Sequence, residues 1–194
     1  MANPERGFIF DLDGTLVDTM PTHFRAWTEI ADRHGLTFPE DRFYSLGGVP
    51  TTKIAGMLIS EAGLTLDPIA IARDKEQAYY DSLVNGATIK PIDVVVELAR
   101  QHRDEGPMAV ASGSVRRLVE RTLELLGVAD WFAATVAAED TVRHKPEPDV
   151  FLEAARRIGV DPACCLVYED TDIGLEAAHR AGMSAVDVRK LVKP

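Results

Sequence analysis

The stretch Phe8-Ile9-Phe10-Asp11-Leu12-Asp13-Gly14-Thr15 places two carboxylates and a glycine directly after a short apolar segment. A short apolar run that stops at a turn signal is typical of a buried strand in a parallel sheet. Glycine lets the backbone turn tightly and approach a ligand closely. Taken alone, Asp13-Gly14 is equally compatible with an ordinary turn. We expect a strand that ends in a polar loop at residue 11.

Other apolar segments of strand length follow along the chain, at residues 108–111, 134–137, 166–168 and, more weakly, 185–188. Between them, apolar residues recur at helical spacing, as in residues 115–126 and 150–158. Strands that alternate with helices favour an α/β fold with a parallel sheet covered by helices on both faces. The sequence therefore predicts an α/β core.

Residues 21–83 break this alternation. Phe24, Trp27 and Ile30 have helical spacing, a second helical run surrounds residues 69–80, and no segment predicts a strand convincingly. We expect a helical insertion with turn-type residues as hinges at Asp18-Thr19 and Lys90-Pro91. The predicted organisation is a core domain of residues 1–18 and 88–194 and an inserted helical domain of residues 19–87.

Composition narrows the possible partners. The chain has 194 residues and a formal net charge of −10, which argues against nucleic acid and anionic membrane surfaces as partners. No apolar run approaches the ~18 residues typical of a membrane span, and no secretory leader is evident. The adjacent Cys164 and Cys165 lie in an expected strand and favour no disulfide. We expect a cytoplasmic monomer.

Polar residues follow each of the main expected strands. Besides the aspartates of the first segment, these are Ser112-Gly113-Ser114, His144-Lys145-Pro146 and Glu169-Asp170. Each has a simpler interpretation alone, since Ser114 suits a helix N-cap, Lys145 a surface, and the acidic pair a helix dipole. Ligands of parallel sheets gather at the carboxyl ends of strands. The joint occurrence of these residues predicts one site at that edge.

The residue types suit phosphoryl transfer. Clustered carboxylates repel one another unless a cation lies among them, and oxygen ligands favour Mg²⁺ over zinc. A carboxylate can attack a phosphoryl centre, and a second can protonate the leaving oxygen and then deprotonate water. The developing negative charge needs donors, which Ser112, the amides around Gly113 and Lys145 would supply.

With these residues assembled, the chain resembles the haloacid dehalogenase superfamily over nearly its whole length. The resemblance implies a Rossmann-like core sheet, Asp11 as nucleophile, Asp13 as acid/base, Ser112 and Gly113 as phosphate-binding residues, and Lys145 as charge balancer. It also implies Mg²⁺ held by Asp11, the backbone carbonyl of Asp13 and Asp170, with Glu169 acting through water. The matching stretches are residues 10–16, 111–114, 144–149 and 168–174.

The inserted segment resembles the cap of the β-phosphoglucomutase group, most clearly at His23-Phe24-Arg25-Ala26-Trp27. Residues 47–55 and 181–189 are similar to bacterial fructose-1-phosphate phosphatases. This resemblance implies that cap residues choose the substrate, with His23, Gly48, Thr52 and Lys75 as candidates. The alternative is that His23 packs against Trp27 and Lys75 lies on a solvated helix face.

The implied function is a magnesium-dependent phosphatase of small phosphorylated metabolites, such as fructose 1-phosphate. A sugar-phosphate mutase shares the core motifs, but mutase relatives grip the far phosphate with a cap arginine, whereas residues 49–53 contain none. Arg25 or Lys75 could reach the same space. A dehalogenase is disfavoured by Asp13, because no leaving oxygen would need its proton. A non-catalytic phosphometabolite-binding protein is the alternative from another class, and intact motifs argue against it.

Overall fold

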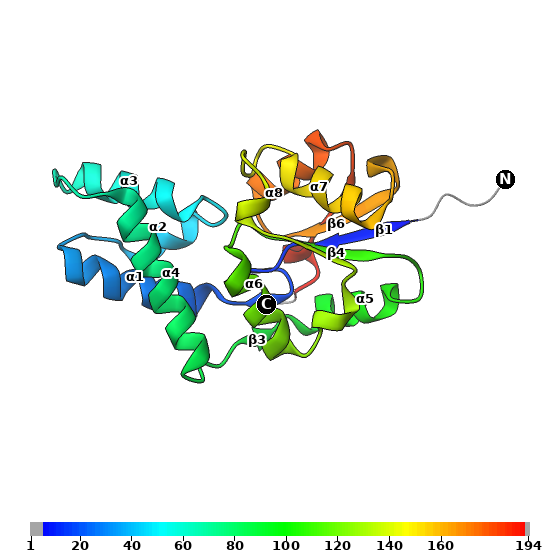
Figure 1. Cartoon of the computed structure of the whole chain (residues 1–194), viewed down its shortest axis with the longest axis horizontal. Coiled ribbons are helices and arrows are strands. Elements are labelled where there is room, and N and C mark those ends of the chain that lie inside the picture. Colours follow the sequence, from blue (N-terminus) through cyan, green and yellow to red (C-terminus); the bar gives the residue numbers. More distant parts are fainter. Residues whose placement is uncertain (1–5, 193–194) are drawn as a thin grey trace. The chain divides into compact units, whose positions relative to one another are not determined.

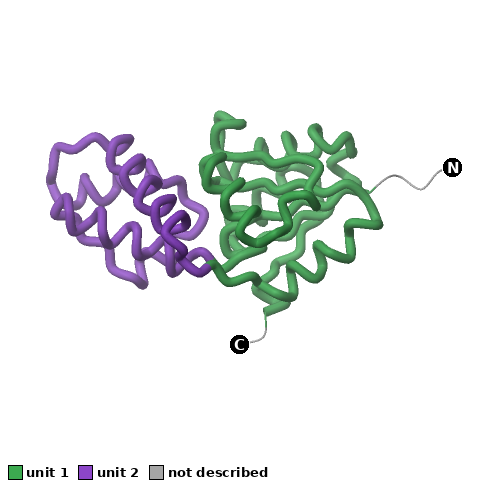
Figure 2. Tube along the Cα trace, turned by 60° about the horizontal axis from the view of Figure 1, so that its bottom comes forward, with its two compact units in different colours: residues 1–18, 89–194 green, residues 19–88 purple. Residues whose placement is uncertain are grey.

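The computed structural model describes residues 6–192 (Figure 1). The chain folds as two compact units, coloured separately in Figure 2. The sheet unit comprises residues 1–18 and 89–194, and the helical unit comprises residues 19–88. The chain therefore passes twice between the units, after residue 18 and after residue 88.

A five-stranded sheet forms the centre of the sheet unit. Its order is β5-β4-β1-β6-β7, and every neighbouring pair is parallel, which confirms the predicted α/β class. Each expected strand is present, and no bound differs from the expected one by more than one residue. The strands are β1 (Gly7–Phe10), β4 (Met108–Ala111), β5 (Ala134–Val136), β6 (Cys165–Glu169) and β7 (Ser184–Asp187).

Helices cover both faces of this sheet. Alternation along β1 sends Phe8 and Phe10 into one apolar cluster and Ile9 into another. The first cluster includes residues of α5 (Asp93–His102) and α6 (Arg116–Leu126). The second includes residues of α7 (Asp149–Ile158) and α8 (Asp172–Arg180). Both faces of the central strands are buried, as the continuous apolar runs predicted.

The helical unit contains α1 (Met20–His34), α2 (Glu40–Ser45), α3 (Thr51–Glu61) and α4 (Pro68–Val84). Its own apolar cluster includes Trp27 and Ile30 of α1, Leu58 of α3 and Ile71 of α4. Gly35 ends α1 in the left-handed conformation, and Asp67 caps α4 by accepting from the amide of Ile69. The expected helical insertion thus has a core of its own.

One small sheet was not predicted from the sequence. Three of the turn-type residues expected at the hinges, Asp18, Lys90 and Pro91, lie in an antiparallel ribbon of β2 (Val17–Asp18) and β3 (Lys90–Pro91). Asp18 lies opposite Lys90 in this ribbon. Two-residue strands carry too little periodicity to be recognised from sequence. Short 3₁₀ helices occur at η1 (Ala129–Trp131), η2 (Ala138–Asp140), η3 (Pro162–Cys164) and η4 (Val188–Lys190).

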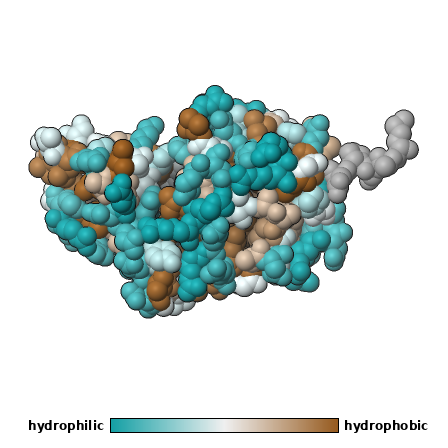
Figure 3. All heavy atoms as spheres, in the orientation of Figure 1, coloured by the Kyte–Doolittle hydropathy of each residue, from teal (hydrophilic) through white to brown (hydrophobic). Residues whose placement is uncertain are grey.

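The face drawn in Figure 3 is largely hydrophilic, with apolar residues scattered over it. None of the helices in residues 6–192 combines the length and apolar character that a membrane span requires. Cys164 and Cys165 are both free.

Candidate active site

A tight turn holds the carboxylates that follow β1 at the carboxyl edge of the sheet. The amide of Asp11 donates to the carbonyl of Tyr168 in β6 at 3.0 Å, which extends the parallel pairing by one residue. The carbonyl of Leu12 then accepts from the amides of residues 15, 16 and 17, and the Leu12 side chain is buried. The buried Asp11 and half-buried Asp13 are therefore fixed by backbone bonds and by an apolar anchor.

Lys145 bridges two of the carboxylates. Its Nζ lies 2.6 Å from Oδ1 of Asp11 and 2.8 Å from Oε2 of Glu169, and all three side chains are buried. Burial alone would lower the pKa of Lys145, but the charges of Asp11 and Glu169 more than offset burial and raise it. The ammonium thus stays charged between the two carboxylates, and its role as charge balancer stays a prediction.

Asp11, Glu169 and Asp170, which we call the acidic trio, could hold one metal ion, since each offers an oxygen within 4.8 Å of the others. Burial is the largest cause that raises the pKa of Asp11 well above its ordinary value, although Lys145 opposes it. Burial and the nearby Glu169 raise the pKa of Asp170 to about 7. Buried carboxylates that destabilise one another's charge fit a hard divalent cation such as Mg²⁺.

Glu169 is held by residues that the sequence reasoning did not single out. Its Oε1 accepts from the amide of Thr171 at 3.0 Å and from the Thr171 hydroxyl at 2.6 Å. The same hydroxyl accepts from the amide of Gly174 and so caps α8. A Cβ at residue 174 would lie 2.0 Å from Cδ of Glu169. The threonine next to the acidic pair was the available signal, because Thr is a common N-cap residue.

Asp170 has its own support from the loop after β1. The buried Thr15 donates its hydroxyl to Oδ1 of Asp170 at 3.0 Å. Gly14 has a φ of 87° and passes so close that a Cβ would lie 2.2 Å from Oδ2 of Asp170. Glycine is therefore required here by both backbone conformation and space, as its position after the aspartates suggested.

One of the two serines after β4, Ser114, does not have the helix-capping role that the sequence suggested. Ser114 does not cap α6, because the N-cap residue is Val115 and it makes no side-chain cap bond. Instead, the Ser114 hydroxyl donates to Oδ2 of Asp13 at 2.7 Å, and its amide donates to Oγ of Ser112 at 3.0 Å. Ser112 is buried, and Gly113 is exposed with open space where a Cβ would be. The loop thus positions the Asp13 side chain.

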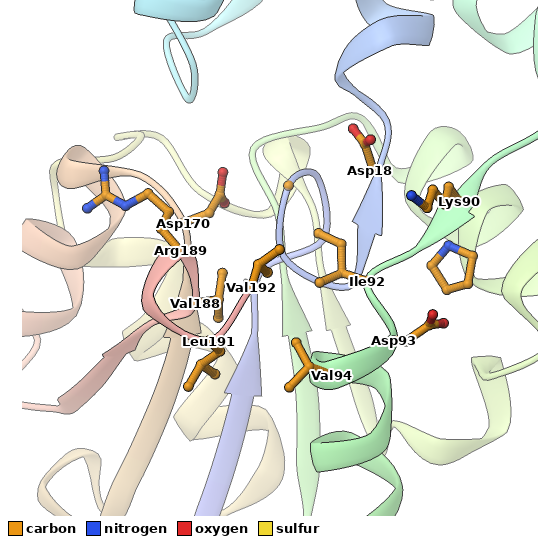
Figure 4. A pocket seen from close by; sticks show the side chains of 12 residues that line it. Asp18, Lys90, Ile92, Asp93, Val94, Asp170, Val188, Arg189, Leu191 and Val192 are labelled. Carbon is orange, nitrogen blue, oxygen red and sulfur yellow. The ribbon is translucent and has the colours of Figure 1, made fainter. Parts of the chain in front are cut away.

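A hollow of about 870 Å³ borders the acidic trio on the side of Asp170 (Figure 4). Its aliphatic walls come from Ile92 and Val94 on one side and from Val188, Leu191 and Val192 near the carboxyl end of the chain on the other. The polar lining includes Asp18, Lys90, Asp93 and Arg189. Arg189 is itself engaged by Asp172 and Asp187.

Two of the four candidate specificity residues meet inside the helical unit. Lys75 Nζ lies 2.7 Å from Nδ1 of His23, and the His23 ring stacks on Tyr79 with centroids 3.9 Å apart. Lys75 is buried, so the alternative of a solvated helix face is wrong. Gly48 is exposed in the loop before α3 with a φ of 79°, and Thr52 is exposed in the first turn of α3.

With fold and geometry established, comparison with known proteins defines the class. Residues 5–182 match the family model described as haloacid dehalogenase-like hydrolase. The chain belongs to this family. The predicted family is therefore confirmed, and so is the prediction of a hydrolytic enzyme.

Individual relatives extend over almost the whole chain. The fructose-1-phosphate phosphatase YqaB of Escherichia coli strain K12 is 43% identical over 185 residues, which cover 95% of this chain and 97% of that protein. The β-phosphoglucomutase of Bacillus subtilis strain 168 is 32% identical and covers 94% of this chain and 83% of its own length. A crystal structure of β-phosphoglucomutase from Clostridium difficile superposes with a TM-score of 0.83 at 23% identity, covering 97% of this chain and 87% of that one. At this low sequence identity, the similarity to the Clostridium difficile structure shows a shared fold alone.

Proposed function

We propose that this protein is a magnesium-dependent phosphatase of sugar monophosphates, with fructose 1-phosphate as the leading candidate substrate, and that Asp11 carries the phosphoryl group as an aspartyl-phosphate. The observation that carries the proposal is the buried contact of Lys145 with Asp11 and Glu169 beside Asp170. A cation-binding acidic trio and a fixed ammonium are the groups that phosphoryl transfer needs.

In the first step, the Asp11 carboxylate attacks phosphorus, and the bond from phosphorus to the ester oxygen breaks. The Asp13 carboxyl gives its proton to the departing oxygen. In the second step, water attacks phosphorus of the aspartyl-phosphate while Asp13 takes the proton, so that phosphate leaves and Asp11 is restored. The bond from Ser114 to Asp13 supports this assignment, since it orients the Asp13 carboxyl beside the loop that would bind the phosphoryl group.

The remaining residues bind and orient the phosphoryl group. Ser112 and the amides around Gly113 would donate to its oxygens, and Lys145 would balance the charge that develops on them. Asp11, Asp170 and the backbone carbonyl of Asp13 would hold Mg²⁺, with Glu169 acting through water. When bound, the metal neutralises negative charge on Asp11 and on the phosphoryl oxygens.

We propose that the helical unit acts as a cap and that its residues select the substrate. The pair of His23 and Lys75 offers a buried ring nitrogen and an ammonium, and Gly48 and Thr52 flank the start of α3. The name of the relative with 43% identity supports fructose 1-phosphate. The names of other relatives, a hexitol phosphatase and a phosphorylated-carbohydrate phosphatase, support the wider class of phosphorylated carbohydrates.

The decisive test is release of inorganic phosphate from hexose 1-phosphates, hexose 6-phosphates, pentose phosphates and nucleoside monophosphates. Each assay is run with Mg²⁺ and with EDTA. We expect the highest kcat/KM among sugar monophosphates and no turnover with EDTA. Full activity after exhaustive chelation would contradict the metal assignment, and a preference for nucleoside monophosphates would contradict the substrate class.

A mutase is the second candidate because a β-phosphoglucomutase is 32% identical to this chain. Residues 49–53 contain no arginine that could grip a far phosphate bidentately, which favours water as the acceptor. The two activities separate when glucose 1-phosphate is supplied with a catalytic amount of hexose bisphosphate. Formation of glucose 6-phosphate without free phosphate would establish the mutase instead. A monomeric state and a cytoplasmic location stay predictions.

A further inference from the structure

A carboxylate already occupies the start of the helix that follows the proposed phosphate-binding loop. The amide of Arg116, the first residue of α6, donates to both carboxylate oxygens of Glu139, at 3.1 and 2.9 Å. Glu139 belongs to η2 and is exposed. The free amides and positive dipole of a helix start would otherwise attract an anionic ligand. At α6, the protein supplies that anion itself.

This carboxylate is bonded to the same loop that orients Asp13, the residue that faces the leaving group in the proposed mechanism. A proton donor must contact the departing oxygen, so the leaving group lies beside Asp13. Ser114 donates to Asp13 at 2.7 Å and precedes Arg116 by two residues. The carbonyl of Ser114 also accepts from the amide of Ala138 at 3.0 Å, which ties η2 to the same loop. Glu139 is therefore connected, through the Arg116 amide and the Ser114 backbone, to the loop whose Ser114 hydroxyl orients Asp13.

The positive charge of the Arg116 side chain is balanced by carboxylates of the protein itself. The guanidinium of Arg116 donates to the carboxylate of Asp140 and lies 3.4 Å from Oε1 of Glu120. Asp140 also pairs with Arg157 at 2.8 Å, so the carboxylate is fixed from two sides. An arginine engaged in this way is not poised to grip a phosphate group of the substrate. Glu139, by contrast, accepts here from a neutral backbone amide.

We propose that Glu139 is a specificity-determining residue that disfavours leaving groups with a second anionic group, and so restricts the enzyme to monophosphates of neutral sugars. The inference rests on the proposed function and adds to it a source of selectivity inside the sheet unit. A second phosphate directed toward α6 would meet a carboxylate in place of free amides. The same repulsion would weaken retention of a bisphosphate, which a mutase requires.

The test compares Glu139→Gln with the matched control Glu120→Gln. Both variants remove one negative charge near Arg116, but Glu120 lies one helical turn further along the exposed face of α6. A glutamine at position 139 keeps an oxygen that can accept from the Arg116 amide. Hydrolysis of 4-nitrophenyl phosphate serves as the assay, with fructose 1,6-bisphosphate and inorganic phosphate as competitive inhibitors. The readout is the ratio of their two inhibition constants.

We expect Glu139→Gln to strengthen inhibition by the bisphosphate relative to phosphate by roughly three- to tenfold at low salt, as loss of one exposed charge near a dianion predicts. The gain should shrink as salt is added, because exposed charges are screened. Glu120→Gln should leave the ratio at its wild-type value. An unchanged ratio in Glu139→Gln, or an equal change in both variants, would overturn the inference.

A second variant and a separate assay keep the outcomes distinct. Glu139→Ala also removes the charge but loses the bond to Arg116, so it should shift the ratio in the same direction even though it lowers the melting temperature. Opposite shifts in the two variants would contradict a charge effect. Phosphate release from fructose 1-phosphate by the wild-type protein is measured in parallel. If that release is absent while the inhibition ratio still responds to Glu139→Gln, the substrate proposal fails and the role of Glu139 stands.

Discussion

Nζ of Lys145 lies 2.6 Å from Oδ1 of Asp11, and both side chains are buried at the carboxyl edge of the central sheet. The two residues are 134 positions apart in the sequence. The parallel strands bring them together, since Asp11 follows β1 and Lys145 lies in the loop that leads from β5 and η2 to α7. The same ammonium compensates the buried charges of Asp11 and Glu169 in the resting protein and would compensate the phosphoryl charge in the proposed reaction. Protein stability and catalysis are therefore expected to depend on one side chain.

Replacement of Lys145 by methionine should therefore impair both catalysis and folding. We expect kcat to fall by on the order of 10²-fold or more, as for loss of a donor that stabilises the transition state. Removing one partner of a buried ion pair typically costs ~3–5 kcal/mol of unfolding free energy. Adding Asp11→Asn should restore part of that stability, because it removes a buried charge that has lost its partner. Urea denaturation of the two single variants and the double variant measures the coupling, and strictly additive losses would contradict it.

Replacement of Asp13 by asparagine should slow the chemical step without weakening metal binding. The side chain handles the proton, whereas the proposed metal ligand at this residue is its backbone carbonyl. Loss of a general acid typically costs ~10² to 10⁴ in rate. Steady-state kinetics at several Mg²⁺ concentrations give kcat and the metal concentration for half-maximal activity. Near-normal kcat together with much weaker metal activation would show that the two roles were exchanged.

The stability of the metal-free protein should decrease as the pH rises from about 4 to about 7. In the folded state, burial and Glu169 raise the pKa of Asp170 to about 7, above its ordinary value of 3.8, so the folded protein binds more protons than the unfolded chain in this window. Burial raises the pKa of Asp11 in the same direction. Mg²⁺ binds the ionised carboxylates, so the stabilisation it provides should grow with pH.

Melting temperatures with EDTA and with excess Mg²⁺, at about pH 5.5 and about pH 8, test this linkage. The gain from Mg²⁺ should be larger at the higher pH in the wild-type protein. Asp170→Asn should reduce both the gain and its pH dependence, because residue 170 no longer titrates. A larger Mg²⁺ gain at the lower pH would contradict the assignment of the acidic trio.

Two glycines within helices should respond in opposite ways to replacement by alanine. At Gly174 in α8, a Cβ would lie 2.0 Å from Cδ of Glu169, so Gly174→Ala should displace the Glu169 carboxylate and weaken Mg²⁺ activation. At Gly56 in α3, a Cβ would lie 4.0 Å from Cβ of Pro68, and Gly56→Ala should stabilise the protein by up to ~1 kcal/mol through helix propensity. Thermal denaturation and metal titration of both variants measure the difference. Equal behaviour of the two variants would contradict the close packing of Glu169 on α8.

Much of this architecture could be predicted because the signals are local. Apolar runs such as the one in β1 and helical spacing in α6 and α7 indicate their elements directly, and parallel topology then predicts that strand ends meet. The β2–β3 ribbon could not be predicted, because two-residue strands show no periodicity. The bond from Ser114 to Asp13 was missed because the sequence pattern favoured a helix N-cap, whereas the tertiary contact decides where that hydroxyl points. The burial of Lys75 likewise depends on its neighbours in the helical unit.

The central claim is that Asp11 becomes phosphorylated during turnover, and chemical trapping tests it most directly. Borohydride reduces an acyl-phosphate to an alcohol, so a phosphorylated aspartate is converted to homoserine. The enzyme is mixed with Mg²⁺ and excess fructose 1-phosphate, quenched with borohydride during turnover, digested and examined by peptide mass spectrometry. We predict homoserine at position 11 only when substrate and Mg²⁺ are both present, and none in Asp11→Asn. Continued release of phosphate with aspartate unmodified at position 11, or homoserine at another aspartate, would contradict the account.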